Sequence, residues 1–189
     1  MTILRSSEYQ RMPWKNGGGT TTEIWKAASP AGEMLWRLSI ADVATDGPFS
    51  EFPGIDRWIM VISGKGMELT IEGLGAKRLD RPFEPLFFSG DAKTECKLID
   101  GPIRDFNFMI ARGFGKGTLQ VLRLTAGMAA PLGENTAAIH VLAGDVEIET
   151  NDIRQLAASD TWIAEQPGKA KVTGEALIAI ISIDTVTGA

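Results

Sequence analysis

The chain has 189 residues, of which 44% are hydrophobic and 23% are charged. This balance is typical of a folded globular protein and argues against long disordered segments. Lys and Arg number 19 against 24 Asp and Glu, a net charge of -5, and no basic run supplies the face that a nucleic-acid-binding protein needs.

Short segments rich in β-branched, aromatic and Met residues recur along the chain between turn residues. They predict strands at 22–26, 35–41, 58–62, 68–72, 86–89, 95–99, 106–110, 118–124, 138–142, 146–150, 161–164 and 176–183. No segment of 12 or more residues has the 3.6-residue period of an amphipathic helix. The sequence therefore predicts an all-β sandwich or barrel.

A weak internal repeat divides these strands into two sets. The sequence VISG at 61–64 precedes an alternating strand, and so does VLAG at 141–144. SGD at 89–91 has a counterpart in ASD at 158–160. Strand, glycine turn and strand is the order of a jelly roll, so we expect two jelly-roll halves packed as one unit, residues 1–112 and 113–189, joined at the glycine-rich segment 112–117.

No apolar run approaches the roughly 18 to 20 residues of a membrane-spanning helix, so we expect no membrane partner. The first residues, MTILRSSEYQRMPW, hold three charged side chains where a signal peptide needs an unbroken apolar stretch. Cys96 is the only cysteine, which excludes an internal disulfide. We therefore expect a cytoplasmic location.

His140 is the only histidine, and this count excludes much metal chemistry. Catalytic zinc and iron sites draw on two or three imidazoles, so His140 and Cys96 cannot build one. No G-x-S-x-G motif accompanies His140, and no D-x-D-x-D-G loop predicts a calcium site. The sequence predicts a metal-free protein without a cofactor, in which His140 is structural.

The least generic stretch is PWKNGGGTTTEIW, at 13–25. Three consecutive glycines lose much backbone entropy on folding, so an ordered chain keeps them where a close approach or an unusual conformation requires them. Lys15 and Asn16 stand directly before them and offer a cation and an amide. A flexible hairpin with solvated flanks is the other interpretation. No helix signal or G-K-[ST] follows, so this is not a phosphate loop.

Charged and amide side chains also occur at strand positions shared with apolar residues. Arg57 alternates with Ile59 and Val61, and a partly buried guanidinium needs an anionic partner. Asp56, Glu51, Asp105 or the carboxylate of a ligand could serve. Asn107 lies on one predicted strand face with Asp105 and Met109, although Asn is disfavoured inside strands, so it is either a satisfied core amide or a ligand contact. The same two interpretations apply to Arg37 on an earlier strand.

Taken together, these stretches resemble the HutD/Ves family, bicupin proteins associated with bacterial histidine utilisation. The segments that carry the resemblance run in family order: PWKNGGGTTTEI, WRLSIADV with DGPFSEFPGIDR, FSGD with CKLIDGP, and DFNFM. The resemblance implies a bicupin fold that lacks the usual metal-binding histidines. Residues 1–112 would form the cupin half with the family motifs and the ligand pocket, and residues 113–189 a degenerate cupin half.

The resemblance also implies a small-molecule binding protein, with N-formylglutamate or urocanate as ligand and a role in limiting flux through histidine degradation. The positions that match the family's signature polar residues are Lys15, Asn16, Arg57 and Asn107, with Arg37 and Asp105 as secondary members. We expect these residues to converge on one pocket. We also expect Arg57 to await a ligand there rather than to stabilise the fold.

Two other classes of function stay open. A metal-independent cupin enzyme, an isomerase or lyase acting on a small acid, would use Lys15 or Asp105 for proton transfer. A structural module would use the Arg and Asn side chains only to satisfy one another. A homodimer is compatible with a cupin fold, although the sequence identifies no interface.

Overall fold

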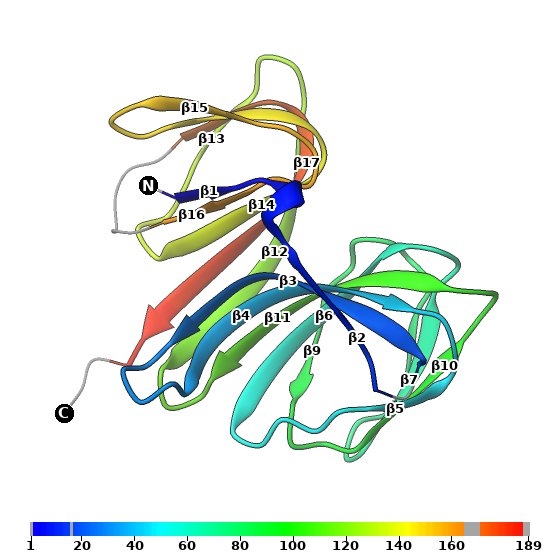
Figure 1. The fold of residues 1–189 in the computed structure, drawn as a ribbon. Helices are drawn as coiled ribbons and strands as arrows, with labels where there is room; N and C mark the ends of the chain where they lie inside the picture. The colour runs from blue at the N-terminus through cyan, green and yellow to red at the C-terminus, as the bar shows by residue number, and fades with distance from the viewer. Residues whose placement is uncertain (1, 16, 165–170, 187–189) are drawn as a thin grey trace. The chain divides into compact units, whose positions relative to one another are not determined.

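The structure is a computed structural model that describes residues 2–15, 17–164 and 171–186. The chain divides into two compact units (Figure 1). One unit runs from Gln10 to Gly115. The other combines the described residues up to Tyr9 with those from Lys116 onward.

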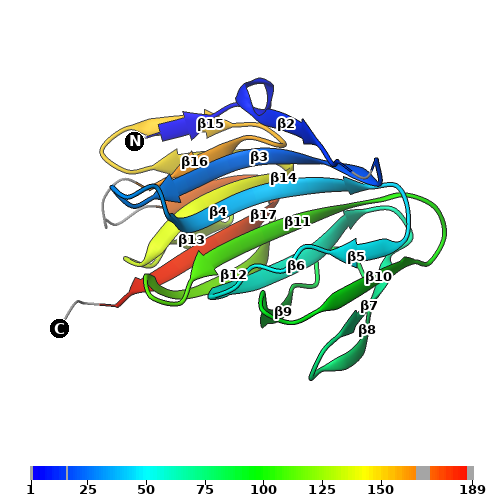
Figure 2. The same cartoon turned by 60° about the horizontal axis from the view of Figure 1, so that its bottom comes forward.

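The unit Gln10–Gly115 contains two antiparallel sheets, and the neighbouring strands of the larger one lie side by side in Figure 2. The larger sheet has the order β2 (Gln10–Pro13), β3 (Gly19–Ala28), β4 (Met34–Val43), β11 (Ile103–Ala111), β6 (Ile55–Ser63), β9 (Leu86–Ser89). The smaller sheet has the order β5 (Gly47–Phe49), β10 (Thr94–Leu98), β7 (Met67–Ile71), β8 (Gly75–Leu79). Apolar side chains from both sheets form one core, including Ile59 and Val61 from β6 and Leu69 and Ile71 from β7.

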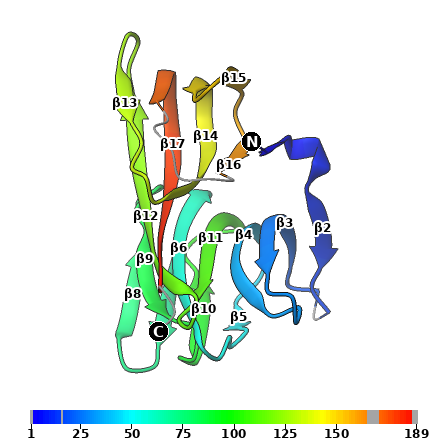
Figure 3. The same ribbon diagram turned by 90° about the vertical axis from the view of Figure 1, so that its left-hand side faces the viewer.

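The other unit is built on a seven-stranded sheet, in which the long strands β14 and β17 lie side by side (Figure 3). The main path is β1 (Thr2–Leu4), β16 (Thr161–Ile163), β14 (Thr136–Glu149), β17 (Lys171–Thr185), β12 (Gly115–Leu124). β13 (Ala129–Pro131) pairs with β17, and β15 (Ile153–Leu156) pairs with β14. A single 3-10 turn, η1 (Ser6–Glu8), follows β1.

The predicted fold class is confirmed, because the described residues contain strands throughout and no α-helix. None of the described helical segments has the length and apolar character of a membrane span. The boundary between the units lies between Gly115 and Lys116, within the glycine-rich segment 112–117 and three residues after the expected bound at 112. Residues 2–9 also lie with the second unit, because β1 pairs with β16 and Tyr9 contacts Thr161.

One predicted turn is wrong. The sequence predicts separate strands at 138–142 and 146–150 with a glycine turn between them, but β14 runs through Gly144 from Thr136 to Glu149. Gly144 has φ 79, and a Cβ there would lie 2.2 Å from the carbonyl oxygen of Glu175 on β17. The register between β14 and β17 shifts between Val141 and Ala143. The glycine therefore permits an irregularity inside a paired strand instead of a turn.

Candidate ligand-binding site

The site residues come together because three neighbouring strands of the larger sheet are in antiparallel register. β11 lies between β4 and β6, and Asn107 is opposite Ser39 on one side and Ile59 on the other. Two residues along, Met109 is opposite both Arg37 and Arg57. Since side chains alternate between the faces of a sheet, these six side chains and that of Asp105 share one face.

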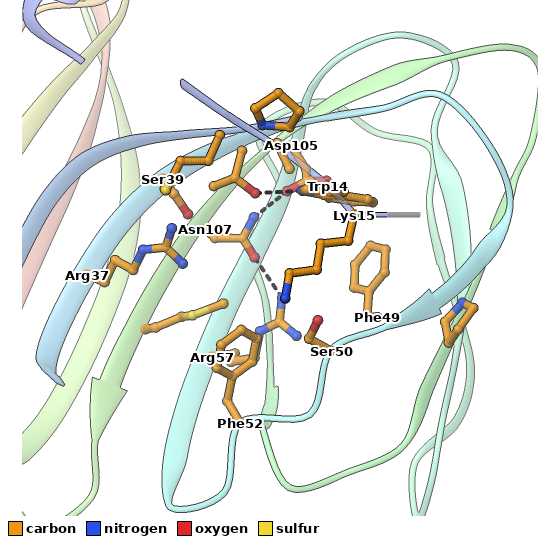
Figure 4. Close-up of a pocket in the computed structure, with 16 residues that line it drawn as sticks. Trp14, Lys15, Arg37, Ser39, Phe49, Ser50, Phe52, Arg57, Asp105 and Asn107 are labelled. Atoms are coloured by element: carbon orange, nitrogen blue, oxygen red, sulfur yellow. Dashed lines mark hydrogen bonds between the residues drawn. The ribbon is translucent and has the colours of Figure 1, made fainter. Parts of the chain in front are cut away.

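This face forms one wall of a pocket of about 530 Å³ (Figure 4). Five of the six residues singled out in the sequence line the pocket: Lys15, Arg37, Arg57, Asp105 and Asn107. The sixth, Asn16, lies outside the described residues. The other lining residues are Met12, Pro13, Trp14, Thr21, Ser39, Ala41, Pro48, Phe49, Ser50, Phe52 and Met109. Three of the lining side chains are cationic and one is acidic, so cationic groups outnumber acidic ones in the pocket wall.

Arg57 is buried in the wall of the pocket, with a relative exposure of only 4%. Its guanidinium carbon lies 5.7 Å from the ring centre of Phe49, 5.4 Å from that of Phe52 and 5.0 Å from that of Phe88. Three rings at such distances provide cation–π attraction for a charge that has lost its hydration. Burial lowers the pKa of Arg57 to about 10, so the side chain stays protonated at neutral pH.

A chain of hydrogen bonds joins the buried cation to a buried acid. Arg57 donates from Nη2 to Oδ1 of Asn107 at 2.9 Å, and Asn107 donates from Nδ2 to Oδ1 of Asp105. Arginine can only donate, so the amide oxygen of Asn107 faces Arg57 and its nitrogen faces the carboxyl group. Asn107 thereby links two side chains of opposite charge.

The expectation that Arg57 awaits a ligand without stabilising the fold disagrees with this arrangement. Its guanidinium already contacts three phenylalanine rings and holds Asn107 in position. A buried charge with such partners stabilises the native state, because its removal leaves polar atoms unsatisfied. Arg57 therefore combines a structural role with its position in the pocket.

Asp105 is fully buried, with a relative exposure of 0%. Burial raises its pKa to about 7, although the charge of Arg57 and the hydrogen bond from Asn107 act in the opposite direction. Two buried polar atoms at the pocket, Oδ2 of Asp105 and Nε of Arg57, have no hydrogen-bond partner among the described residues. Buried polar atoms are usually satisfied, so these two mark a place where further hydrogen bonds can form.

Arg37 has a partner that the sequence reasoning missed. Its Nε donates to Oε2 of Glu23 on β3 at 2.7 Å, and both side chains are mostly buried. The remaining guanidinium nitrogens of Arg37 are not used in that bond. A signal for the pair exists in the sequence, because Thr21 and Glu23 alternate in the strand that follows the glycines.

The loop after β2 forms the rim of the pocket. Trp14 donates from Nε1 to the hydroxyl of Thr21 at 2.8 Å, and its backbone N–H bonds the carbonyl of Gly19 at 2.9 Å. Lys15 is exposed and extends from this loop into the pocket, toward Arg57 (Figure 4). These two bonds of Trp14 thus fix the point of the loop from which the Lys15 side chain enters the pocket.

The glycine run has two distinct constraints, and they lead to a prediction. Gly17 has φ 73 with open space around it, whereas a Cβ on Gly19 would lie 2.4 Å from the backbone oxygen of Asp42. We expect Gly17→Ala to lower the free energy of unfolding by about 1 kcal/mol. Gly19→Ala must displace backbone, and we expect about 3 kcal/mol, the upper end for overpacking. Urea unfolding of both variants measures the difference, and equal losses would contradict this account.

The remaining candidate groups carry no reactive arrangement. Burial raises the pKa of the Cys96 thiol to about 12, which makes it a poor nucleophile. His140 is buried and its Nδ1 lies 2.8 Å from the hydroxyl of Thr161. Within the described ranges, no three His, Cys, Asp or Glu side chains are grouped so that they could hold a metal ion.

Comparison with known proteins agrees with the pattern of motifs around the pocket. The HutD family model matches residues 6–180. The chain belongs to the HutD family. An uncharacterized 21.2 kDa protein from the hutC 3' region of Pseudomonas putida is 47% identical over 115 residues, which cover 59% of this chain and 58% of that protein, less than two thirds of its length. Protein Ves of Citrobacter koseri is 31% identical over 142 residues, which cover 72% of each chain.

Solved structures extend the comparison to almost the whole chain. HutD from Pseudomonas fluorescens SBW25 has a TM-score of 0.82 at 34% identity, covering 97% of this chain and 98% of that one. A cupin 2 conserved barrel domain protein from Leptotrichia buccalis has a TM-score of 0.58 at 12% identity, covering 87% and 88% of the two chains. The second likeness concerns the fold alone. The chain is thus a HutD-family protein with a cupin-like fold.

Proposed function

We propose that this protein binds a small carboxylic acid in the pocket around Arg57, and that the acid is an intermediate of histidine degradation, N-formylglutamate or urocanate. The observation that carries the proposal is a buried, charged guanidinium in the wall of a pocket that also contains Lys15 and Arg37. A guanidinium in such a place recognises carboxylates well, because its planar N–H groups can pair with both oxygens. The regulatory role, a limit on pathway flux, is part of the same proposal.

The two candidate acids would use the pocket differently. N-formylglutamate has two carboxylates and a formamide, so its second carboxylate would meet Arg37 or Lys15, and its formamide would pair with Asn107. Urocanate has one carboxylate and a flat conjugated ring, which fits the aromatic lining from Trp14, Phe49 and Phe52. The family name and the hutC neighbourhood of the Pseudomonas putida relative support the choice of this pathway.

Calorimetric titration with both acids and with their uncharged primary amides tests the proposal. We expect at least one acid to bind at a ratio of one per chain, and its amide to bind much more weakly. Thermal melting with the same compounds should show a higher melting temperature for the acid alone, because a ligand that binds only the native state stabilises it. If no acid binds, or if acid and amide bind equally, the proposal is wrong.

Lys15 provides a smaller test of the same site. Because this ammonium group is exposed, we expect Lys15→Met to weaken binding of the acid only about three- to tenfold, with a larger effect at low salt. Lys65→Met, at another exposed lysine of the same unit, is the matched control and should leave affinity unchanged. An equal effect of both substitutions would indicate a general charge effect instead of a contact in the pocket.

The alternative function is a metal-independent isomerase or lyase, and one observation favours it. Asp105 lies in the pocket wall with its pKa raised to about 7 by burial, which suits a group that gives and takes protons near neutral pH. Incubation of each acid with the protein, followed over time by NMR, separates the two functions. A binding protein leaves the acid unchanged, whereas an enzyme yields a product whose formation stops with Asp105→Asn.

A further inference from the structure

We propose that Asp105 takes up a proton when the pocket binds a carboxylate ligand, so that binding at this site is linked to pH. The inference rests on the proposed function, because it concerns how the same pocket accommodates an anion. It goes beyond that function by assigning a role to a buried acid whose second oxygen, Oδ2, has no hydrogen-bond partner among the described residues.

With a ligand bound, one buried cation, Arg57, would face two negative charges, those of Asp105 and of the ligand carboxylate. Asp105 forms no ion pair within the described part of the chain, and its link to Arg57 passes through the amide of Asn107. A ligand carboxylate that bonds Arg57 would share the charge that now offsets Asp105. Two carboxylates beside one guanidinium, away from water, repel each other strongly, and protonation of one of them removes the repulsion.

The groups around Asp105 come from several elements. On the neighbouring strands, β6 contributes Arg57, while β4 contributes Arg37 and Asp42. The side chains directly opposite Asp105 on these strands, Ala41 and Val61, are apolar. Among the described residues, the other titratable groups near this face are Glu23 on β3, which is paired with Arg37, and Lys15 at the pocket rim. The buried thiol of Cys96 on β10 and Asp46 before β5 complete the set, and both carboxylates, Asp105 and Asp46, raise the pKa of that thiol.

These neighbours leave Asp105 close to the balance between its two forms. Its pKa is raised to about 7, because burial and, to a smaller extent, Asp42 raise it more than Arg57 and the hydrogen bond from Asn107 lower it. A carboxylate placed against Arg57 weakens the strongest of the lowering influences and adds a negative charge nearby. The pKa of Asp105 must therefore rise when the ligand binds, and the proton comes from the solvent.

Protonation also gives a hydrogen-bonding role to Oδ2 of Asp105, the oxygen without a partner among the described residues. Oδ1 of Asp105 already accepts a hydrogen bond from Asn107, so the proton belongs on Oδ2. A neutral carboxyl group donates one O–H bond, and an oxygen of the ligand carboxylate is a suitable acceptor. No bond other than the one to this proton forms or breaks. The site would thus hold its ligand with one charged and one neutral donor.

Calorimetry in two buffers of different ionisation enthalpy whose buffering species are not small anions, triethanolamine and Tris, tests the inference at pH 8. The probes are N-formylglutamate and urocanate, whose ring is neutral at this pH. We expect uptake approaching one proton per bound ligand, and an affinity that falls by up to tenfold for each pH unit above the pKa of the free site. Asp105→Asn keeps the hydrogen bond to Asn107 and should show no uptake and a flat pH profile.

Asp42→Asn is the matched control, since it removes a neighbouring carboxylate of β4 and should leave proton uptake in place. NMR titration of the Asp105 carboxyl carbon in the wild-type protein gives a second readout that needs no variant. Its pKa should be higher with ligand than without. Binding without proton uptake, equal in wild type and Asp105→Asn, overturns this inference alone, whereas binding of neither acid overturns the proposed function and the inference with it.

Discussion

Substitution of Arg57 by alanine is expected to weaken binding of the carboxylate ligand by roughly 30-fold to a few thousand-fold. The expectation follows from the loss of about 2 to 5 kcal/mol when one partner of a buried, hydrogen-bonded charge pair is removed. Arg57 is the most buried of the three cations in the pocket, so solvent screens its charge least. Calorimetric titration of the wild type and of Arg57→Ala with the same acid measures the ratio.

The same substitution should also lower the free energy of unfolding, by about 1 to 3 kcal/mol, because Oδ1 of Asn107 loses its donor and Asp105 loses the nearby positive charge. Arg57→Lys keeps the charge but cannot pair with a carboxylate through a planar fork. Compared with Arg57→Ala, it should therefore restore more of the lost stability than of the lost affinity. Arg78→Ala, at an exposed arginine of β8, is the control and should change neither quantity. Strong destabilisation of Arg57→Ala with unchanged affinity would favour a purely structural role.

The stability of the protein should depend on pH through Asp105. The pKa of this carboxyl group is about 7 in the folded state, above its ordinary value of 3.8. Between these values the folded chain binds a proton that the unfolded chain has lost. The contribution of Asp105 to the free energy of unfolding therefore falls as the pH rises from about 4 to about 7, by roughly 4 kcal/mol, and is constant at higher pH.

The contribution is isolated by comparison with Asp105→Asn, which cannot ionise at this position. Urea unfolding of both proteins from pH 4 to pH 8 should show the wild type losing stability relative to the variant up to neutral pH. Other carboxylates affect both proteins alike and cancel in the difference. Asp42→Asn should not remove this slope. A difference that is flat across the range would mean that Asp105 titrates normally in the fold.

The fold class could be predicted because the alternation of apolar and polar residues is visible within each short strand of the sequence. The strand that carries Phe106, Asn107 and Phe108 was recognised from its own residues, and its two faces are as expected. The pairing of β1 with β16 could not be predicted, because these strands are distant in the sequence and three residues of β1 carry little pattern. Gly144 was misread for a related reason, since a glycine with positive φ serves a turn and a strand irregularity equally well.

The convergence of these residues on one pocket could be predicted, but the contacts among them could not. Short motifs identified Lys15, Arg37 and Arg57, and the antiparallel register explains why such distant residues share a face. The sequence left the partner of Arg57 open among several acids, and the structure places the amide of Asn107 between it and Asp105. Phe88 and Glu23 were missed, because contacts across strands depend on register, which no single strand encodes.

A crystal structure of this protein with the bound acid tests the central claim most directly. The account predicts the carboxylate of the ligand in the pocket, with an oxygen about 3 Å from a guanidinium nitrogen of Arg57 and the other within reach of Asp105 Oδ2. Crystals of Arg57→Lys soaked under the same conditions should show a weakly occupied pocket. Electron density for the acid away from Arg57, for example with its carboxylate bonded only to Lys15, would contradict the account.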